Sequence, residues 1–335
     1  MTSHDPDERA APDNSAHAST DSSTHGCTHD DADLRRQRDE LGVRMMLIRH
    51  KITVLSGKGG VGKSTVAVNL AATLAAAGRR VGLFDADLHG PSVPTLLGLH
   101  YMPQLGHAGG IAPAQVADNL WAMSIQFFLP DKHDAVIWRG PRKYSFIREI
   151  LASVDWGHLD CLVVDAPPGT GDEALALVEL LGSDTGAVIV STPQRVAVTD
   201  VRKALGFCAT LDLPVLGVIE NMSGFVCPHC GETTDVFLSG GAETMADEAG
   251  VPFLGRVPLD PAVVQAGEQG VPFVQGAPDS ATAAAFAAAV QPLLLLTERP
   301  AVQLPVPAPV AATPTTPTAA GRTTGAKKKR DRKPR

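Results

Sequence analysis

The segment VLSGKGGVGKSTVAVNL, residues 54–70, constrains the fold more strongly than any other part of the chain. It places the pattern G-x-x-x-x-G-K-[S/T], Gly57 to Ser64, between an apolar β-branched run and an Ala-rich helical pattern. The glycines allow several backbone N–H groups to turn toward one anion, and the N-terminus of the following helix adds the positive end of its dipole. The sequence therefore predicts a phosphate-binding loop that joins a strand to a helix.

The side chains of this loop have distinct predicted tasks. Lys63 should reach the β- and γ-phosphates of a nucleotide, which makes it a candidate catalytic residue, and the hydroxyl of Ser64 should ligate Mg2+. The other expected nucleotide contacts come from the rest of the loop and the start of the helix: Gly57, Lys58, Gly59, Gly60, Val61, Gly62 and Thr65.

Short apolar runs alternate with longer helical patterns from Arg49 onward, which is typical of a parallel sheet with helices on both faces. The expected strands are 51–56, 80–85, 161–166, 186–192, 214–221 and 253–258, and the expected helices are 63–77, 144–153, 173–181, 198–211, 244–249 and 281–296. The strands are apolar along most of their length, as strands buried on both faces are. The predicted fold class is α/β: a P-loop NTPase with a mostly parallel, doubly wound sheet, in one domain of residues 36–298.

Both ends of the chain differ in composition from this domain. Residues 1–35 are rich in Asp, Ser and His, and residues 299–335 run from a Pro/Ala/Thr-rich linker to the basic end GRTTGAKKKRDRKPR. Such segments bury too little apolar surface to offset the entropy of ordering them. We therefore expect both tails to be disordered.

Charge and hydropathy argue against several classes of protein. A net charge of -7 does not favour a domain built around nucleic acid, although the basic tail could still bind nucleic acid electrostatically. The apolar runs are too short to span a bilayer, and the N-terminus lacks the basic-then-apolar pattern of a secretion signal. We expect a cytoplasmic protein without a membrane partner. Its five cysteines, an odd number, favour reduced thiols over a disulfide framework.

Two of these cysteines, Cys227 and Cys230, lie in the loop-like run SGFVCPHCGETTDVF. Thiolate metal sites normally need four ligands, and this chain has only one pair with this spacing. The pair alone is compatible with an iron–sulfur cluster, with a structural zinc completed by remote residues, or with a redox pair. Cys161 and Cys208 fall in buried patterns, and Cys27 lies in the N-terminal tail, where we expect no specific site.

The phosphate loop resembles the deviant Walker A loop of the family that contains nitrogenase iron protein, the Min and Par ATPases and the arsenite pump ATPase. The likeness rests on Lys58, which follows the first glycine in GKGGVGKST. It implies that Lys58 reaches across a dimer interface to the partner's phosphates, a catalytic role. It also implies that Asp87 in GLFDADLHGPS positions the attacking water, that Asp165 in CLVVDAPPGTGD holds the Mg2+ water shell, and that Asn221 recognises adenine.

A closer resemblance extends over most of the domain, from about Arg49 to Pro292. DADLHGPSVPTLLGL, VIWRGPRKYSFIREIL, STPQRVAVTDVRKAL, VLGVIENMSGFVCPHCG and GRVPLDP together resemble the Mrp family of iron–sulfur cluster carrier ATPases. The resemblance implies a homodimer that binds a [4Fe-4S] cluster between subunits through Cys227 and Cys230 of each chain. It also implies weak ATP hydrolysis coupled to transfer of the cluster to apo iron–sulfur proteins.

A second interpretation belongs to another functional class. Par and Min relatives are positioning ATPases that cycle on DNA or membrane, and the basic C-terminus would suit such a role. In that case the cysteine pair would be a structural zinc or redox site, a feature that the positioning role does not itself explain. The sequence thus favours the cluster carrier, with nucleic acid an unlikely partner.

Overall fold

The computed structural model describes residues 27–106, 110–129, 140–227, 229–230 and 232–297. All of these residues lie within the unit formed by residues 1–298. The helices are α1 (Cys27–Met46), α2 (Lys63–Ala76), α3 (Val93–Leu96), α4 (Gly140–Ser153), α5 (Asp172–Leu181), α6 (Arg195–Thr210), α7 (Gly241–Ala249), α8 (Pro261–Glu268), α9 (Phe273–Gly276), α10 (Ala281–Thr297) and the 3-10 helix η1 (Ile125–Phe128). The strands are β1 (Ile48–Leu55), β2 (Val81–Asp85), β3 (Gln104–Leu105), β4 (Ile111–Ala112), β5 (Ala114–Ala117), β6 (Leu120–Ser124), β7 (Leu159–Asp165), β8 (Thr185–Ser191), β9 (Val215–Val226), β10 (Thr233–Thr234) and β11 (Phe253–Leu259).

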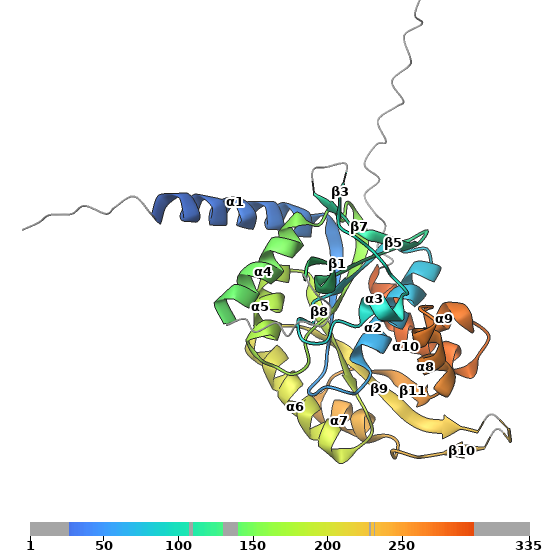
Figure 1. Ribbon diagram of the computed structural model, residues 1–335. Coiled ribbons are helices and arrows are strands. Elements are labelled where there is room, and N and C mark those ends of the chain that lie inside the picture. The colour runs from blue at the N-terminus through green and yellow to red at the C-terminus, as the bar shows by residue number, and fades with distance from the viewer. Residues whose placement is uncertain (1–26, 107–109, 130–139, 228, 231, 298–335) are drawn as a thin grey trace, which may run out of the picture. The chain divides into compact units, whose positions relative to one another are not determined.

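Nine of the described strands form one sheet in the order β10-β9-β8-β1-β7-β2-β6-β5, with β11 paired to β9 (Figure 1). The pairs β1–β7, β1–β8, β2–β7, β2–β6, β8–β9 and β9–β11 are parallel. Only the edge pairs β5–β6 and β9–β10 of this sheet are antiparallel. The predicted mostly parallel α/β sheet is confirmed.

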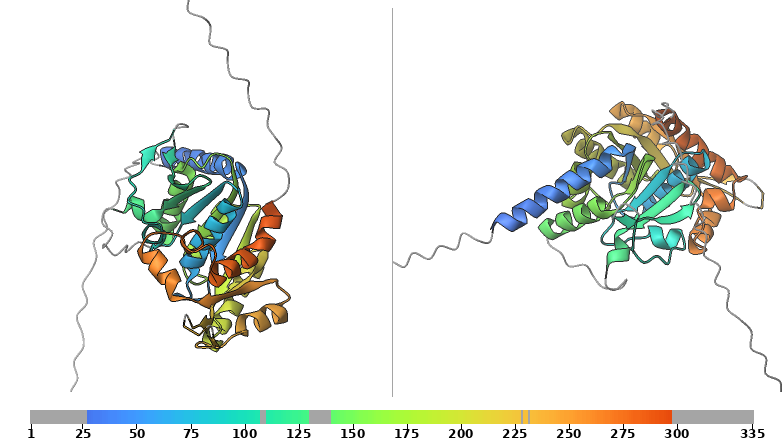
Figure 2. Two further views of the ribbon diagram at one scale, coloured as in Figure 1. Left: turned by 90° about the vertical axis from the view of Figure 1, so that its right-hand side faces the viewer. Right: turned by 90° about the horizontal axis from the view of Figure 1, so that it is seen from above.

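Successive residues of the central strands face opposite sides of the sheet, and each side has its own core. Leu55, Phe84, Val164 and Ile189 pack against the helices α1, α4, α5, α6 and α7. Their preceding neighbours pack against α2, α9 and α10: Val54, Leu83, Val163 and Val188. Figure 2 shows these two helical layers around the sheet. The alternation follows from the two-residue period of a strand, and burial on both faces explains why the strands are apolar throughout.

The first helix corrects the predicted extent of the N-terminal tail. Residues 27–35 were expected to be disordered, but they belong to α1. The last turns of this helix pack against α4, where Leu41 and Met45, four residues apart, are buried. This docking nucleates a helix whose polar N-terminal turns extend away from the sheet (Figures 1 and 2). Residues 1–26 and 298–335, which contain the rest of both predicted tails, lie outside the described residues.

The sequence also missed the edge of the main sheet formed by β5 and β6, residues 114–124. β6 pairs in parallel with β2, and β5 turns back against β6. Each of these strands has only four or five residues, too few for a clear hydrophobic pattern. Among the described residues, no helix combines the length and apolar character needed to cross a membrane.

Candidate functional site

The phosphate loop (residues 56–64) connects β1 to α2 at the carboxyl edge of the parallel strands. Gly60 and Gly62 have φ values of 81° and 80°, a left-handed conformation that glycine adopts at little cost. Gly57 packs against α6: a Cβ at this position would lie 2.3 Å from the carbonyl oxygen of Asp200. The loop is thus held in place by the neighbouring helix.

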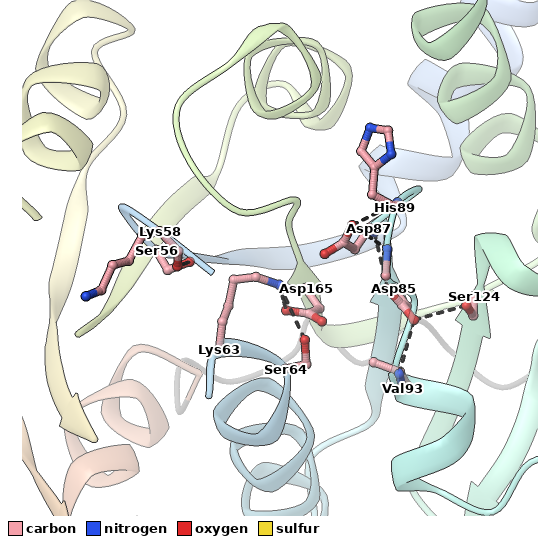
Figure 3. Close-up of polar contacts among 11 residues, drawn as sticks. Ser56, Lys58, Lys63, Ser64, Asp85, Asp87, His89, Val93, Ser124 and Asp165 are labelled. Carbon is pink, nitrogen blue, oxygen red and sulfur yellow. Dashed lines mark hydrogen bonds and ion pairs between the residues drawn. The ribbon is translucent and has the colours of Figure 1, made fainter. Parts of the chain in front are cut away.

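A cavity of about 550 Å³ and a second of about 310 Å³ lie at the same carboxyl edge of the sheet as the phosphate loop. The smaller one is enclosed by the phosphate loop and by the segment after β2, and its lining includes Lys58, Gly59, Gly60, Gly62, Lys63, Ser64, Thr65 and Asp87. The fold therefore gathers most of the predicted phosphate-binding residues around one space. Figure 3 shows Lys63, Ser64 and Asp165 close together there, with the Lys58 side chain extending away from them.

Lys63 forms a buried ion pair with Asp165. Its Nζ also lies 3.5 Å from the hydroxyl of Ser64. Burial raises the pKa of Asp165, and the ammonium of Lys63 acts in the opposite direction. The second carboxylate oxygen of Asp165 is buried without a hydrogen-bond partner. An unpaired carboxylate oxygen beside a serine hydroxyl is a donor set that suits Mg2+, which takes oxygen ligands.

Asp85, at the end of β2, is paired in register with Asp165 and is fully buried. Its carboxylate accepts hydrogen bonds from the backbone N–H of Asp87 (3.2 Å), the N–H of Val93 (3.1 Å) and the hydroxyl of Ser124 (3.0 Å). Burial, reinforced by the negative charge of Asp165, raises the pKa of Asp85 to about 8. Asp85 therefore organises the segment that carries Asp87.

Asp87 shapes its own loop. Its Oδ1 accepts hydrogen bonds from the backbone N–H groups of His89 (3.0 Å) and Gly90 (3.1 Å). An aspartate that bonds the backbone two and three residues later fixes a turn. The structure places Asp87 at the edge of the smaller cavity, and its role toward water stays a prediction.

A polar cluster that the sequence did not reveal borders the larger cavity. Glu173, on α5, contacts Lys143 of α4, and its Oε1 lies 3.1 Å from Nε2 of His89. The Nζ of Lys143 lies 2.9 Å from the same histidine nitrogen. These contacts connect the Asp87 loop to two helices. In the sequence, Glu173 is only an acidic residue after the motif PPGTGD. It gave a weak signal, because its partners Lys143 and His89 are remote in sequence.

The loop after β7 contacts the phosphate loop through its backbone. The N–H of Gly169, which has a φ of 87°, donates to the carbonyl of Ser56 at 2.9 Å. A nucleotide phosphate would have to compete with this carbonyl for the N–H group.

Asn221 reaches the phosphate loop from β9. Its Nδ2 donates to the carbonyl of Val61 at 2.9 Å, and a Cβ on Gly62 would lie 2.3 Å from the same nitrogen. The amide thus supports the loop, and recognition of adenine stays a prediction. The preceding residue, Glu220, is fully buried in the same strand. It was not among the site residues predicted from the sequence. A charged residue inside the apolar run VLGVIEN was the available signal.

The cysteine pair lies where β9 turns back into β10, in a segment that we call the cysteine hairpin (residues 225–234). Phe225 pairs with Thr234, and the N–H of Cys227 donates to the carbonyl of Glu232 at 2.9 Å. Cys227 is half-buried and Cys230 is exposed. Hydrogen bonds from the backbone of Cys230 and then His229 lower the pKa of Cys227 and so favour its thiolate.

The four cysteines with described side chains are all free thiols. Cys161 and Cys208 are buried in the core, as their sequence patterns predicted. Nowhere in the described part of the chain do three or more His, Cys, Asp or Glu side chains converge in a group able to hold a metal ion. The described part of one chain therefore supplies two thiolates at the cysteine hairpin and leaves the other ligands unassigned.

Comparison with known proteins assigns the family. The sequence profile described as "ParA: NUBPL iron-transfer P-loop NTPase" matches residues 47–294. The chain is similar to an iron-sulfur cluster carrier protein of Methanocaldococcus jannaschii, with 48% identity over 241 residues that cover 72% of this chain and 83% of that protein. It is also similar to the cytosolic Fe-S cluster assembly factor NUBP2 of Bos taurus, with 48% identity over 253 residues, 74% of this chain and 93% of the relative.

Solved structures show the same architecture. A nucleotide-binding protein of Archaeoglobus fulgidus in complex with ADP matches with a TM-score of 0.63 and 38% identity, covering 70% of this chain and 92% of that one. The cell division ATPase MinD of Pyrococcus furiosus matches with a TM-score of 0.57 and 24% identity over 74% of this chain and 99% of its own, which indicates a shared fold alone. The family expected from the motifs is confirmed, and the chain belongs to the ParA-type family of NUBPL iron-transfer P-loop NTPases.

Proposed function

We propose that this protein is an ATP-dependent carrier of iron–sulfur clusters, which binds its cargo through Cys227 and Cys230 and passes it to apo-proteins. The observation that carries the proposal is a shared strand. β9 supports the phosphate loop through Asn221 and continues into the cysteine hairpin. The names of the two relatives, a cluster carrier and a cluster assembly factor, support the same function. Because NUBP2 is named a cytosolic factor, we propose a cytoplasmic location for this chain as well.

The phosphate loop supplies the chemistry expected of a P-loop NTPase. When ATP binds, the ammonium of Lys63 leaves Asp165 and contacts the phosphates instead. Both carboxylate oxygens of Asp165 would then be free to hold the water shell of Mg2+. Bound Mg2+, held also by Ser64, would neutralise phosphate charge. Asp87, fixed by its own turn, then orients the attacking water. We propose slow hydrolysis that is coupled to cluster transfer.

A homodimer would complete the cargo site. A [4Fe-4S] cluster takes four thiolates, and two copies of the cysteine hairpin related by a two-fold axis would supply them. Exposed apolar side chains beside the pair fit an interface: Val226, Val236 and Leu238. The side chain of Lys58 extends away from the chain's own Lys63 and Asp165, as expected of a lysine that serves the partner subunit (Figure 3).

The alternatives explain less of the molecule. A positioning ATPase shares this fold, but it gives no reason for thiolates at the end of β9. A structural zinc needs further ligands beside the pair, and the described residues offer no such group. A redox pair would work without contacts between β9 and the phosphate loop.

Anaerobic reconstitution with iron and sulfide tests the proposal. The wild type should bind both and show the broad visible absorption of a cluster, whereas Cys227→Ala with Cys230→Ala should bind neither. Cys208→Ala is the matched control, because it removes a buried thiol far from the hairpin in sequence and should retain the cluster. Equal iron and sulfide in the double variant and the wild type, or no cluster absorption in either, would refute the carrier function.

The same reconstitution tests the dimer and the zinc alternative. Sedimentation of the loaded protein should give twice the mass of one chain, and a monomer with a bound cluster would rule out the shared site. Zinc that binds in place of iron, with one metal ion per chain, would favour the structural zinc.

A further inference from the structure

Glu220 is a buried carboxylate that lies between the phosphate loop and the cysteine hairpin in sequence and is fully inaccessible to solvent. One oxygen accepts hydrogen bonds from the hydroxyl of Ser223 (2.6 Å) and the N–H of Gly240 (2.8 Å), and lies 3.6 Å from Nε of Arg256. The other oxygen accepts from the N–H of Ala242 at 2.7 Å. A buried carboxylate needs such donors to offset the loss of its hydration.

Glu220 and its neighbour contact opposite layers of the fold. Along β9, Val218 packs in the core beside α6 and α7, and Ile219 packs in the core beside α2. With the two-residue period of a strand, Glu220 faces α7, whose first turn contains Ala242, and Asn221 faces the phosphate loop. Two consecutive residues thus tie one strand to the nucleotide site and to the helix that follows the hairpin.

The contacts of Glu220 also close the base of the cysteine hairpin. Ser223 lies on the outgoing strand before Cys227, whereas Gly240 and Ala242 follow the returning strand. Ser223 reinforces this closure, because its hydroxyl lies 3.2 Å from that of Ser239. A single carboxylate therefore connects Ser223, which precedes the hairpin, to Gly240 and Ala242, which follow it in the chain.

Between the two ends of this connection β9 is bent rather than regular. Met222 and Gly224 have φ values of 57° and 74°, and a Cβ on Gly62 would lie 3.5 Å from Cε of Met222. A non-glycine residue in the left-handed region persists only where its surroundings hold it. In this segment Asn221 is thus held at the phosphate loop, and Ser223 is held by Glu220.

We propose that Glu220 is a positioning residue that transmits the nucleotide state of the phosphate loop to Cys227 and Cys230. A shift of the Val61 carbonyl moves Asn221 and with it β9. Because Glu220 joins Ser223, before the hairpin, to the start of α7, after it, the hairpin then moves with both instead of slipping past α7. The inference rests on the proposed carrier function, since it gives the cysteines a nucleotide-dependent task.

The variant Glu220→Gln tests this link with little change of shape. The N–H groups of Gly240 and Ala242 point at different oxygens, and a glutamine offers only one oxygen. One of the two N–H groups would then face an amide NH2, so one of the contacts that close the hairpin base is lost. Glu243→Gln is the matched control: Glu243 lies on the same helix and pairs with the same Arg256, but its side chain is 41% exposed.

The readout is the alkylation rate of Cys227 and Cys230 in the full-length, iron-free chain, resolved by peptide mass spectrometry with and without a non-hydrolysable Mg·ATP analogue. In the wild type and in Glu243→Gln the analogue should change the rate about fivefold or more, the usual lower range for coupled sites. In Glu220→Gln the change should fall below about twofold, with analogue affinity unaltered.

A wild-type response in Glu220→Gln would overturn the proposal, as would a wild type whose cysteines ignore a bound analogue or a control that loses the response. If Glu220→Gln does not fold, Ser223→Ala decides, because it removes one contact and keeps the carboxylate: a reduced response supports the link, and an unchanged one overturns it. Alkylation is measured without iron, so failure of cluster binding remains a separate result that concerns the carrier function alone.

Discussion

The charged pair at the phosphate loop is buried inside the fold, whereas the cysteine hairpin stands at its edge. The side chains of Lys63 and Asp165 are 6% and 0% exposed, and a helix, a strand and the Asp87 segment surround the loop. Cys230 is exposed, and the returning strand of the hairpin, β10, has only two residues. One chain thus supplies most of the residues that we expect to bind a nucleotide, but only half of the thiolates that the proposed four-ligand cluster needs.

Because of this difference in burial, the two regions should respond differently to amino-acid substitutions. Charges in the nucleotide site are held in a low-dielectric interior, where each depends on a particular partner. The cysteines depend on access, because a cargo must enter and leave. We therefore expect substitutions at the phosphate loop to act on folding and turnover within one chain, and substitutions at the hairpin to act on assembly and cargo.

The largest effect should follow from Lys63→Ala. It removes the cation that we expect to reach the phosphates, so ATP hydrolysis should fall by about 10²–10³-fold, the usual cost of losing one donor to a developing charge. Release of labelled phosphate at saturating Mg·ATP measures the loss. Arg202→Ala, which removes an ion-paired cation that is 64% exposed, should change the rate by less than about twofold. Undiminished turnover in Lys63→Ala would remove this residue from the mechanism.

Two glycines of the same loop give the next contrast. The Cβ of Gly57→Ala would lie 2.3 Å and 2.4 Å from the backbone O and C of Asp200, so α6 or the loop must shift, at a cost of about 3 kcal/mol. The Cβ of Gly59→Ala meets no atom within 4 Å, and the change should stay within about 0.5 kcal/mol. Urea denaturation of the nucleotide-free variants compares them. Equal stabilities would mean that α6 does not constrain the loop.

The same contrast explains what the sequence could predict. Residues 57–64 follow a local pattern whose backbone geometry is largely determined by glycines, so the loop and its flanking strand and helix were predictable. The position of Cys227 and Cys230 was also readable, as was the burial of Cys161. These features depend on neighbours in sequence or on apolar periodicity, which one chain displays directly.

Contacts between remote segments were not predictable from patterns of this kind. Glu220 binds Gly240 and Ala242, 20 and 22 residues away, and Glu173 meets Lys143 from another helix. The helix α1 was missed because, among its residues with described side chains, the buried apolar ones lie in the last turns, at Leu41 and Met45. In each case the decisive partner is set by how helices pack on the sheet, which a single sequence does not reveal.

Asp85→Asn should change how stability depends on pH. The pKa of Asp85 is raised to about 8 by burial and by Asp165, against an ordinary value of 3.8. Between these values the folded state keeps a proton that the unfolded state releases, so this residue's stabilising contribution is lost as pH rises toward 8. The free energy of unfolding should therefore fall by at most about 1.4 kcal/mol per pH unit over this range.

The asparagine variant cannot titrate and should lack this slope. Urea denaturation at pH 5, 6.5 and 8 measures it as the change in the free-energy difference between variant and wild type. Because Asn also alters one hydrogen bond to the backbone, the absolute difference is less informative than its trend. A difference that stays constant with pH would show that Asp85 is ionised throughout the range.

The smallest effect on folding, and the sharpest test of the incomplete site, should come from Leu238→Asn. Leu238 has a φ of 71° and is 60% exposed. In a monomer, a leucine at this position is unfavourable for two reasons: its apolar side chain faces water, and its backbone adopts the left-handed conformation. Asparagine tolerates that conformation better, and the free energy of unfolding should rise by less than about 1 kcal/mol. A leucine there suits a surface that a second copy covers, so sedimentation of the cluster-loaded variant should show a weakened dimer. Val43→Asn, equally exposed at 60% but on α1, should leave assembly intact. An undisturbed dimer in Leu238→Asn would show that the interface does not include Leu238.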